Sequence, residues 1–183
     1  MKKLLIPVIA LISSPFATFA AFADTRDIHD AHIADVVVTA NSIAIEAGRL
    51  ALSRASRDEV RAYAERMVGE HTGVNRSAIE LAAKLNVTLQ DNPISKSLKA
   101  DGETDFARLQ ALRGEAFDKA YIDHKVILYQ HMLDTIDNRL MPNARNEELK
   151  VLLYNLFSPF SLHLEDAQQI QESLAPGVTR EPG

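Results

Sequence analysis

Four histidines occupy positions where helical periodicity would place an apolar side chain. His71 and His163 lie in two different helical segments, and His124 and His131 share a third. Burying an imidazole costs free energy unless a partner satisfies it. A transition metal ion is one such partner, and imidazole is a common metal ligand. Each histidine alone fits a hydrogen-bonded core position, whereas several converging on one interior predict a metal site.

The carboxylate of Glu46 is expected at nearly the same height along the helices as His71. Counted from the first turn, Glu46 lies about eleven residues before it and His71 about fourteen after it, so at 1.5 Å per residue their heights differ by about 5 Å. His163 and one third-segment histidine fall at mid-height too, and His124 matches that height better than His131. These residues predict a mononuclear iron, zinc or copper site. The alternative for Glu46, which falls on a polar stripe, is that it faces water.

Three further residues bear on this site. Glu70 and Asn75 flank His71, and either can orient the imidazole from outside the metal's ligand set. Alternatively, Glu70 is a solvated charge and Asn75 a boundary residue. Pro159 lies inside the last helical segment, where it predicts a kink costing about 3 kcal/mol unless packing compensates. The kink either re-aims His163 or only fits the helix over its neighbours.

Motifs of known reactions are absent from the sequence. No G-x-S-x-G, H-E-x-x-H or glycine-rich phosphate loop occurs, so no catalytic residue is predicted and an enzyme is disfavoured. The chain has no cysteine, which excludes disulfides, cysteine-ligated zinc and covalent haem. The residues three before His71 and His163 are Val68 and Phe160, so the Glu-x-x-His pairs of di-iron bundles are missing.

The elements that must position these residues are four long helices. Apolar residues recur at three- and four-residue spacing over residues 27–56, 56–85, 114–139 and 146–174. A short connection makes the first two an antiparallel pair. The crossover at 86–104 carries the turn signals Asn92-Pro93 and Asp101-Gly102 and is expected to hold short helical turns, with one more at 105–113. The fold class is all-α: an up-down four-helix bundle of two hairpins joined by this longer crossover.

Local signals refine the helices. Ser56 and Glu59 match a capping box, Asn146 is a plausible N-cap, and Gly48 lets a neighbouring helix approach closely. The third helix has two apolar faces, and the pattern leaves open which one meets the core. One face carries Ile122, Val126, Tyr129, Leu133, Ile136 and Leu140, and the other Phe117, Ala120, Tyr121, Ile127 and Leu128 with the two histidines.

The N-terminus has the pattern of a secretory signal peptide. Lys2 and Lys3 precede the apolar run 4–12, and small residues then lead to predicted cleavage after Ala23. An uncleaved membrane anchor is the alternative. The domains are then 1–23 signal peptide, 24–175 helical bundle and 176–183 frayed tail. Removing the two lysines changes the net charge from −5 to −7, which disfavours nucleic acid and anionic membranes as partners. We therefore expect a periplasmic or extracellular protein that is not stably inserted in a membrane.

Five stretches together resemble a bacterial exported family called domain of unknown function 4142, which is placed among ferritin-like helical bundles. They are SIAIEAGRLAL, YAERMVGEHTGVN, NPISKSLKADGE, GEAFDKAYIDHKVILYQHML and FSPFSLHLEDA, and the resemblance extends from about His32 to Leu174. It implies that Glu46, His71, His131 and His163 stand at the family's recurring polar positions, and that Pro159 is its helix proline. The family's activity is not established, so the resemblance implies fold and compartment but no reaction.

Two hypotheses about function follow. The first is a noncatalytic envelope protein, connected with stress tolerance, that acts by binding a second copy of itself or another envelope protein through the apolar second face of the third helix. The second is a metal-binding or redox bundle using the core histidines. A carrier of lipids or small molecules is the remaining class.

Overall fold

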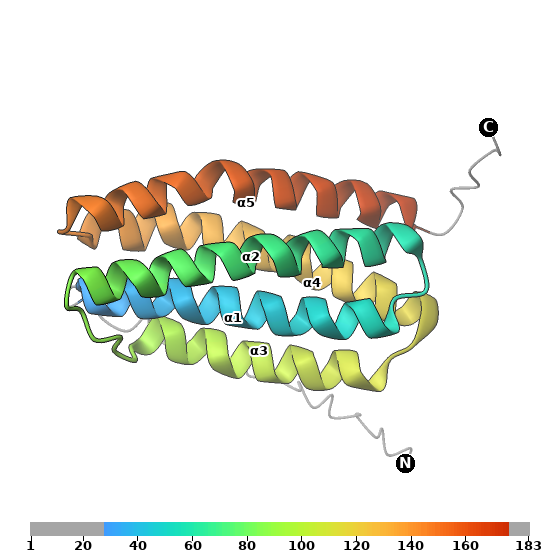
Figure 1. Cartoon of the computed structure of the whole chain (residues 1–183). Coiled ribbons are helices and arrows are strands. Elements are labelled where there is room, and N and C mark those ends of the chain that lie inside the picture. Colours follow the sequence, from blue (N-terminus) through green and yellow to red (C-terminus); the bar gives the residue numbers. More distant parts are fainter. Residues whose placement is uncertain (1–27, 176–183) are drawn as a thin grey trace, which may run out of the picture.

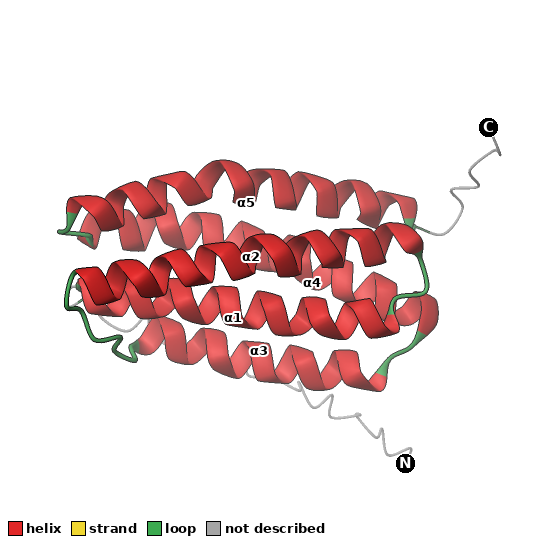
Figure 2. Cartoon of the chain, viewed as in Figure 1, coloured by secondary structure: helices red, strands yellow, loops and turns green. Residues whose placement is uncertain are grey.

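A computed structural model describes residues 28–175, and all regular structure in this range is helical (Figures 1 and 2). The α-helices are α1 (Asp30–Arg54), α2 (Asp58–Lys84), α3 (Pro93–Ala111), α4 (Gly114–Thr135) and α5 (Glu147–Ser173). A π-helical turn, Ile136–Leu140, and a 3-10 turn, Met141–Asn143, follow α4. The predicted all-α class is confirmed. The predicted signal peptide with its cleavage after Ala23, and the tail 176–183, lie outside the described residues.

The five α-helices of residues 28–175 run side by side along one axis, and each reverses the direction of the one before (Figure 1). α1 packs against α2, and α4 packs against α5, as expected for two hairpins. α1 and α2 approach closely at Gly48, because a Cβ placed there would be 2.7 Å from Val68 Cγ2 on α2. The close approach predicted for Gly48 is therefore confirmed.

The crossover differs from the prediction, since it holds the 19-residue helix α3 rather than short turns. Asn92 caps this helix by accepting hydrogen bonds from the backbone N–H of Ile94 (3.0 Å) and Ser95 (3.2 Å), and Pro93 takes the first helical position. Gly102, interpreted from sequence as a turn, lies inside the helix. The carbon atoms of Ile43 on α1 lie 3.1 Å from where a Gly102 Cβ would be, so packing against α1 favours glycine there.

α1 lies among three neighbours, because it contacts α2, α3 and α4. By length and composition alone it could cross a membrane, with a mean hydropathy of 1.2 over an 18-residue window that is half buried. Its apolar character has a simpler origin in this packing, since a helix covered on several sides needs few polar residues.

Both apolar faces of α4 contribute to the core, so the two faces predicted for this helix are not alternatives. Ile122 and Tyr129 from one face, and Phe117 and Tyr121 from the other, are at most 1% exposed. Ile127 on the second face is 65% exposed.

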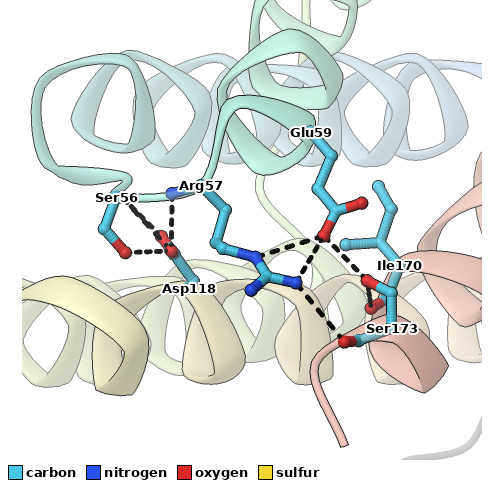
Figure 3. Close-up of polar contacts among 6 residues, drawn as sticks. All are labelled: Ser56, Arg57, Glu59, Asp118, Ile170 and Ser173. Atoms are coloured by element: carbon cyan, nitrogen blue, oxygen red, sulfur yellow. Dashed lines mark hydrogen bonds and ion pairs between the residues drawn. The ribbon is translucent and has the colours of Figure 1, made fainter. Parts of the chain in front are cut away.

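The start of α2 is capped from another helix (Figure 3). Its N-cap is Arg57 rather than Ser56, and Arg57 makes no side-chain cap, so the predicted capping box is wrong. The carboxylate of Asp118 on α4 accepts from the backbone N–H of Ser56 (3.0 Å) and of Arg57 (2.9 Å) instead. Glu59, expected in that box, accepts a hydrogen bond from Ser173 at the end of α5 (2.8 Å). The predicted Asn146 cap of α5 is present.

Candidate functional site

The structure separates the predicted ligands into two groups. His71 on α2 and His163 on α5 lie together in the core, 3% and 4% exposed, with ring centroids 5.5 Å apart. Glu46 and His131 are exposed. Within residues 28–175, no group of three or more His, Cys, Asp or Glu side chains is placed to hold a metal ion. The predicted site of Glu46, His71, His131 and His163 is therefore not formed. Counting residues from the turns estimated the height of each side chain along the bundle, but not its direction around the helix axis.

His71 is held in one tautomer by its neighbours. Its Nδ1 lies 2.7 Å from Asn41 Oδ1, and the Asn41 amide is oriented by donating from Nδ2 to the Val37 carbonyl (2.8 Å). Because Oδ1 can only accept, His71 Nδ1 carries the proton. His71 Nε2 is then unprotonated in the neutral ring and faces the Tyr129 hydroxyl at 2.8 Å. Burial, helped by the positive charge of nearby Lys125, lowers the pKa of His71 to about 3, so this ring is neutral at pH 7.

His163 has one partnered nitrogen and one without a partner. Its Nε2 lies 2.6 Å from Glu70 Oε2, and the Tyr63 hydroxyl donates to its backbone carbonyl (3.1 Å). A carboxylate accepts, so Nε2 carries the proton. The buried Nδ1 has no hydrogen-bond partner in the described part of the chain. Burial lowers the pKa of His163 and outweighs the opposing effect of Glu70.

The two predicted orienting residues have different outcomes. Glu70 does orient an imidazole, but that of His163 rather than of its chain neighbour His71. Asn75 donates a hydrogen bond to the Ser42 hydroxyl at 3.5 Å. Asn41 on α1 takes the position beside His71 that was predicted for Asn75. For Glu70 the reason is rotational: adjacent residues on a helix point about 100° apart, so Glu70 reaches His163 on α5 while His71 does not share its direction.

Three residues of the apolar stripes, Met67, Tyr129 and Phe160, pack around the two buried imidazoles. Met67 lies one turn before His71, and its Sδ is 2.9 Å from the Tyr129 hydroxyl oxygen. The Phe160 ring packs 5.7 Å from the His71 ring and 5.6 Å from the Tyr129 ring. The i, i+4 spacing of Met67 and His71 was a usable signal, because it places both side chains on one helix face. We refer to Met67, His71, Tyr129 and His163 as the core cluster.

Pro159 immediately precedes Phe160 and does not break the helix. α5 continues from Glu147 to Ser173 with the proline inside it, and Figure 1 shows it as one curved helix. The effect of Pro159 on the direction of His163 stays a prediction.

The second group of predicted residues lies beside α3. Glu46 and His124 line a hollow of about 170 Å³ between α1, α3 and α4, and His131 lines a neighbouring hollow of about 280 Å³. His124 Nδ1 lies 2.8 Å from Asp105 Oδ2 on α3. Burial and the charge of Lys125 lower the pKa of His124, against the opposing effect of Asp105. His124 is therefore satisfied by a carboxylate at the bundle's side and does not reach the core cluster.

A buried amine was missed from sequence. Lys125 on α4 is fully buried, and its Nζ lies 5.4 Å from the Tyr121 ring centroid. Neither Lys125 Nζ nor the Tyr121 hydroxyl has a hydrogen-bond partner among residues 28–175. Burial lowers the pKa of Lys125 to about 8. Lysine is usually a surface residue, so the helical pattern gave no reason to place it inside.

Comparisons with known proteins place the chain by family and fold. The model of a family described as "Domain of unknown function (DUF4142)" matches residues 15–170. No curated protein matches the chain. A crystal structure of a DUF305 protein from Streptomyces coelicolor, presented as a secreted protein, is similar with a TM-score of 0.64 and 12% identity, covering 78% of this chain and 91% of that one. At this identity the likeness shows the fold alone.

Proposed function

The chain belongs to the DUF4142 family, whose description assigns no activity, and we propose that it is an exported, noncatalytic helical-bundle protein that acts by self-association in the cell envelope. The signal-peptide pattern ending at Ala23 supports export to the periplasm. The family resemblance supports a ferritin-like arrangement of the helices. A role in stress tolerance belongs to the same proposal.

The observation that carries this proposal is an apolar stripe on the outer face of α5. Val151, Tyr154 and Leu162 are 58%, 70% and 56% exposed. Spacings of three and eight residues keep them on one face of the helix. Beside Val151 the surface is hollowed, and Leu81 of α2 lines the depression. Single exposed apolar residues are ordinary, but three large ones on one face of one helix form a surface that binding a partner would stabilise.

The pattern of the stripe favours a second copy of this chain as the partner. Tyr154 and Leu162 lie four residues before and four residues after Ser158. If α5 packs antiparallel on α5 of another copy with Ser158 at the two-fold axis, each Tyr154 faces the Leu162 of the other copy. Ser158 is exposed and small, which allows the two helices to approach closely at the crossing point. The Tyr154 and Leu162 part of the stripe is thus complementary to itself, while Val151 would face Glu165 of the other copy.

Sedimentation of the mature chain across a wide concentration range tests the proposal. We expect a dimer, and we expect Tyr154→Glu and Leu162→Glu each to give a monomer because a carboxylate would be buried in the apolar contact. Ile127→Glu tests the other surface, the second face of α4 that was predicted from sequence, where Ile127 is 65% exposed. If α5 forms the interface, this variant should leave the dimer intact.

A wild-type monomer at every concentration would refute self-association and would leave a different envelope protein as the partner for this face. A dimer that Ile127→Glu dissociates, but Tyr154→Glu does not, would move the interface to α4.

A further inference from the structure

The buried imidazoles of the core cluster both present an unprotonated nitrogen to the interior. His71 donates from Nδ1 to Asn41, which leaves the Nε2 lone pair directed at the Tyr129 hydroxyl. His163 donates from Nε2 to Glu70, which leaves the lone pair of the buried Nδ1 without a partner in the described chain. In metal sites, histidine ligands almost always donate their second nitrogen to a carboxylate or another oxygen acceptor. Both rings already have that arrangement.

A third donor, the Met67 thioether, lies at the same hydroxyl as His71 Nε2. Met67 Sδ and His71 Nε2 lie 2.9 Å and 2.8 Å from one atom, the Tyr129 hydroxyl oxygen. The His163 ring lies 5.3 Å from the Tyr129 ring and 5.5 Å from the His71 ring. One imidazole nitrogen and a thioether therefore meet at the Tyr129 hydroxyl, the His163 ring lies beside the Tyr129 ring, and Phe160 packs against the Tyr129 and His163 rings. That hydroxyl has a single proton to share between a nitrogen and a sulfur acceptor.

We propose that His71, His163 and Met67 form a binding site for monovalent copper, which the Tyr129 hydroxyl fills when no metal is bound. Thioether sulfur is a soft ligand that selects monovalent copper, whereas magnesium, calcium and manganese prefer oxygen ligands. A buried site without a carboxylate among its ligands suits a singly charged ion better than a doubly charged one, because burying the larger charge costs more. This site differs from the one predicted from sequence, since Glu46 and His131 take no part, and it is independent of the α5 interface.

The first test is an anaerobic titration of the mature chain with monovalent copper, followed by thermal unfolding and by X-ray absorption. An ion that binds only the folded state raises Tm, and copper–sulfur scattering reports the thioether. Met67→Leu keeps the side-chain size but removes the sulfur. Loss of an outer partner already weakens metal sites by about 10- to 100-fold, so this variant should bind at least about tenfold more weakly. Met132→Leu is the matched control, because Met132 is a buried methionine of α4 outside the cluster, and it should bind like wild type.

Tyr129→Phe provides a second, opposite test. It removes the hydroxyl that occupies His71 Nε2 and should make copper binding roughly two- to tenfold tighter, which corresponds to one lost competing hydrogen bond. Glu70→Gln, at an exposed position, should weaken binding because a carboxylate no longer holds His163.

The proposal is overturned if monovalent copper neither binds nor raises Tm in wild type. It is also overturned if Met67→Leu and Met132→Leu bind copper equally, or if Tyr129→Phe folds and binds no more tightly than wild type. In those cases the core cluster is a structural hydrogen-bond network.

Discussion

Lys125 gives the sharpest test of how the interior of this bundle is organised. Its side chain is fully buried on α4, and Nζ has no hydrogen-bond partner in residues 28–175. Nζ lies over the face of the Tyr121 ring, 5.4 Å from the ring centroid, which compensates part of the cost of burying the charge. Replacing Lys125 with methionine keeps an unbranched side chain of similar length and its contact with the ring, but removes the ammonium group.

The size of the effect follows from the shift in pKa. Burial lowers the pKa of Lys125 from 10.5 to about 8. At 1.36 kcal/mol per pKa unit, holding the charged amine in the folded state costs about 3 kcal/mol below pH 8. Contact of the ammonium with the Tyr121 ring offsets about 1 kcal/mol in a typical case, so Lys125→Met should raise the free energy of unfolding at pH 7 by about 2–3 kcal/mol.

The pH dependence has a definite sign. Between pH 8 and pH 10.5 the unfolded chain keeps the Lys125 proton and the folded chain releases it, so the stability of wild type rises with pH in this window. The advantage of Lys125→Met should therefore shrink as the pH increases from 7 to 9.5. Urea unfolding at a series of pH values measures both effects.

Lys96→Met is the control, because Lys96 is exposed and its replacement should change stability by no more than about 0.5 kcal/mol. If Lys125→Met is less stable than wild type at pH 7, the ammonium has a stabilising partner and the reasoning from burial is wrong. A gain that does not depend on pH would instead point to better packing.

Three other substitutions test the joints between helices by thermal or urea unfolding. Asp118→Ala removes the carboxylate that accepts from the start of α2 and should cost about 2–4 kcal/mol. Asp134→Ala, at an exposed position of the same helix where the carboxylate accepts from Asn138 one turn along, should cost less than about 1 kcal/mol, and equal losses would contradict the capping role. Gly48→Ala should cost about 1–3 kcal/mol by pushing against Val68, and a Val68→Ala change in the same chain should recover part of the loss; additive effects would exclude the contact. Pro159→Ala should stabilise α5 by up to about 3 kcal/mol, and a destabilised variant would show that the bundle depends on the curvature at the proline.

Several features of this protein follow from the sequence alone. The three- and four-residue periodicity gave the all-helical class, the position of the long helices and the pairing of the first two. It also placed His71 and His163 inside, because both stand in otherwise apolar stripes. Gly48 was identified as a close approach for a similarly local reason, since only glycine lacks a Cβ.

Tertiary contacts decided that the crossover forms a helix. Of the two turn signals, Asn92-Pro93 marks the start of α3, whereas Asp101-Gly102 lies inside that helix. Helix α3 continues through Gly102 because burying its apolar residues against α1 and α4 outweighs the weak helix propensity of one glycine, about 1 kcal/mol.

The partners of the polar residues were decided by the tertiary structure. Periodicity fixes the height of a side chain and its face on its own helix, but it does not fix how neighbouring helices are rotated and offset. That rotation turns Glu46 and His131 to the surface, brings Asn41 to His71 and Glu70 to His163, and carries Asp118 to the start of α2. Hydrogen bonds and metal–ligand bonds depend on distances of a few tenths of an ångström, and only side-chain packing in three dimensions sets these.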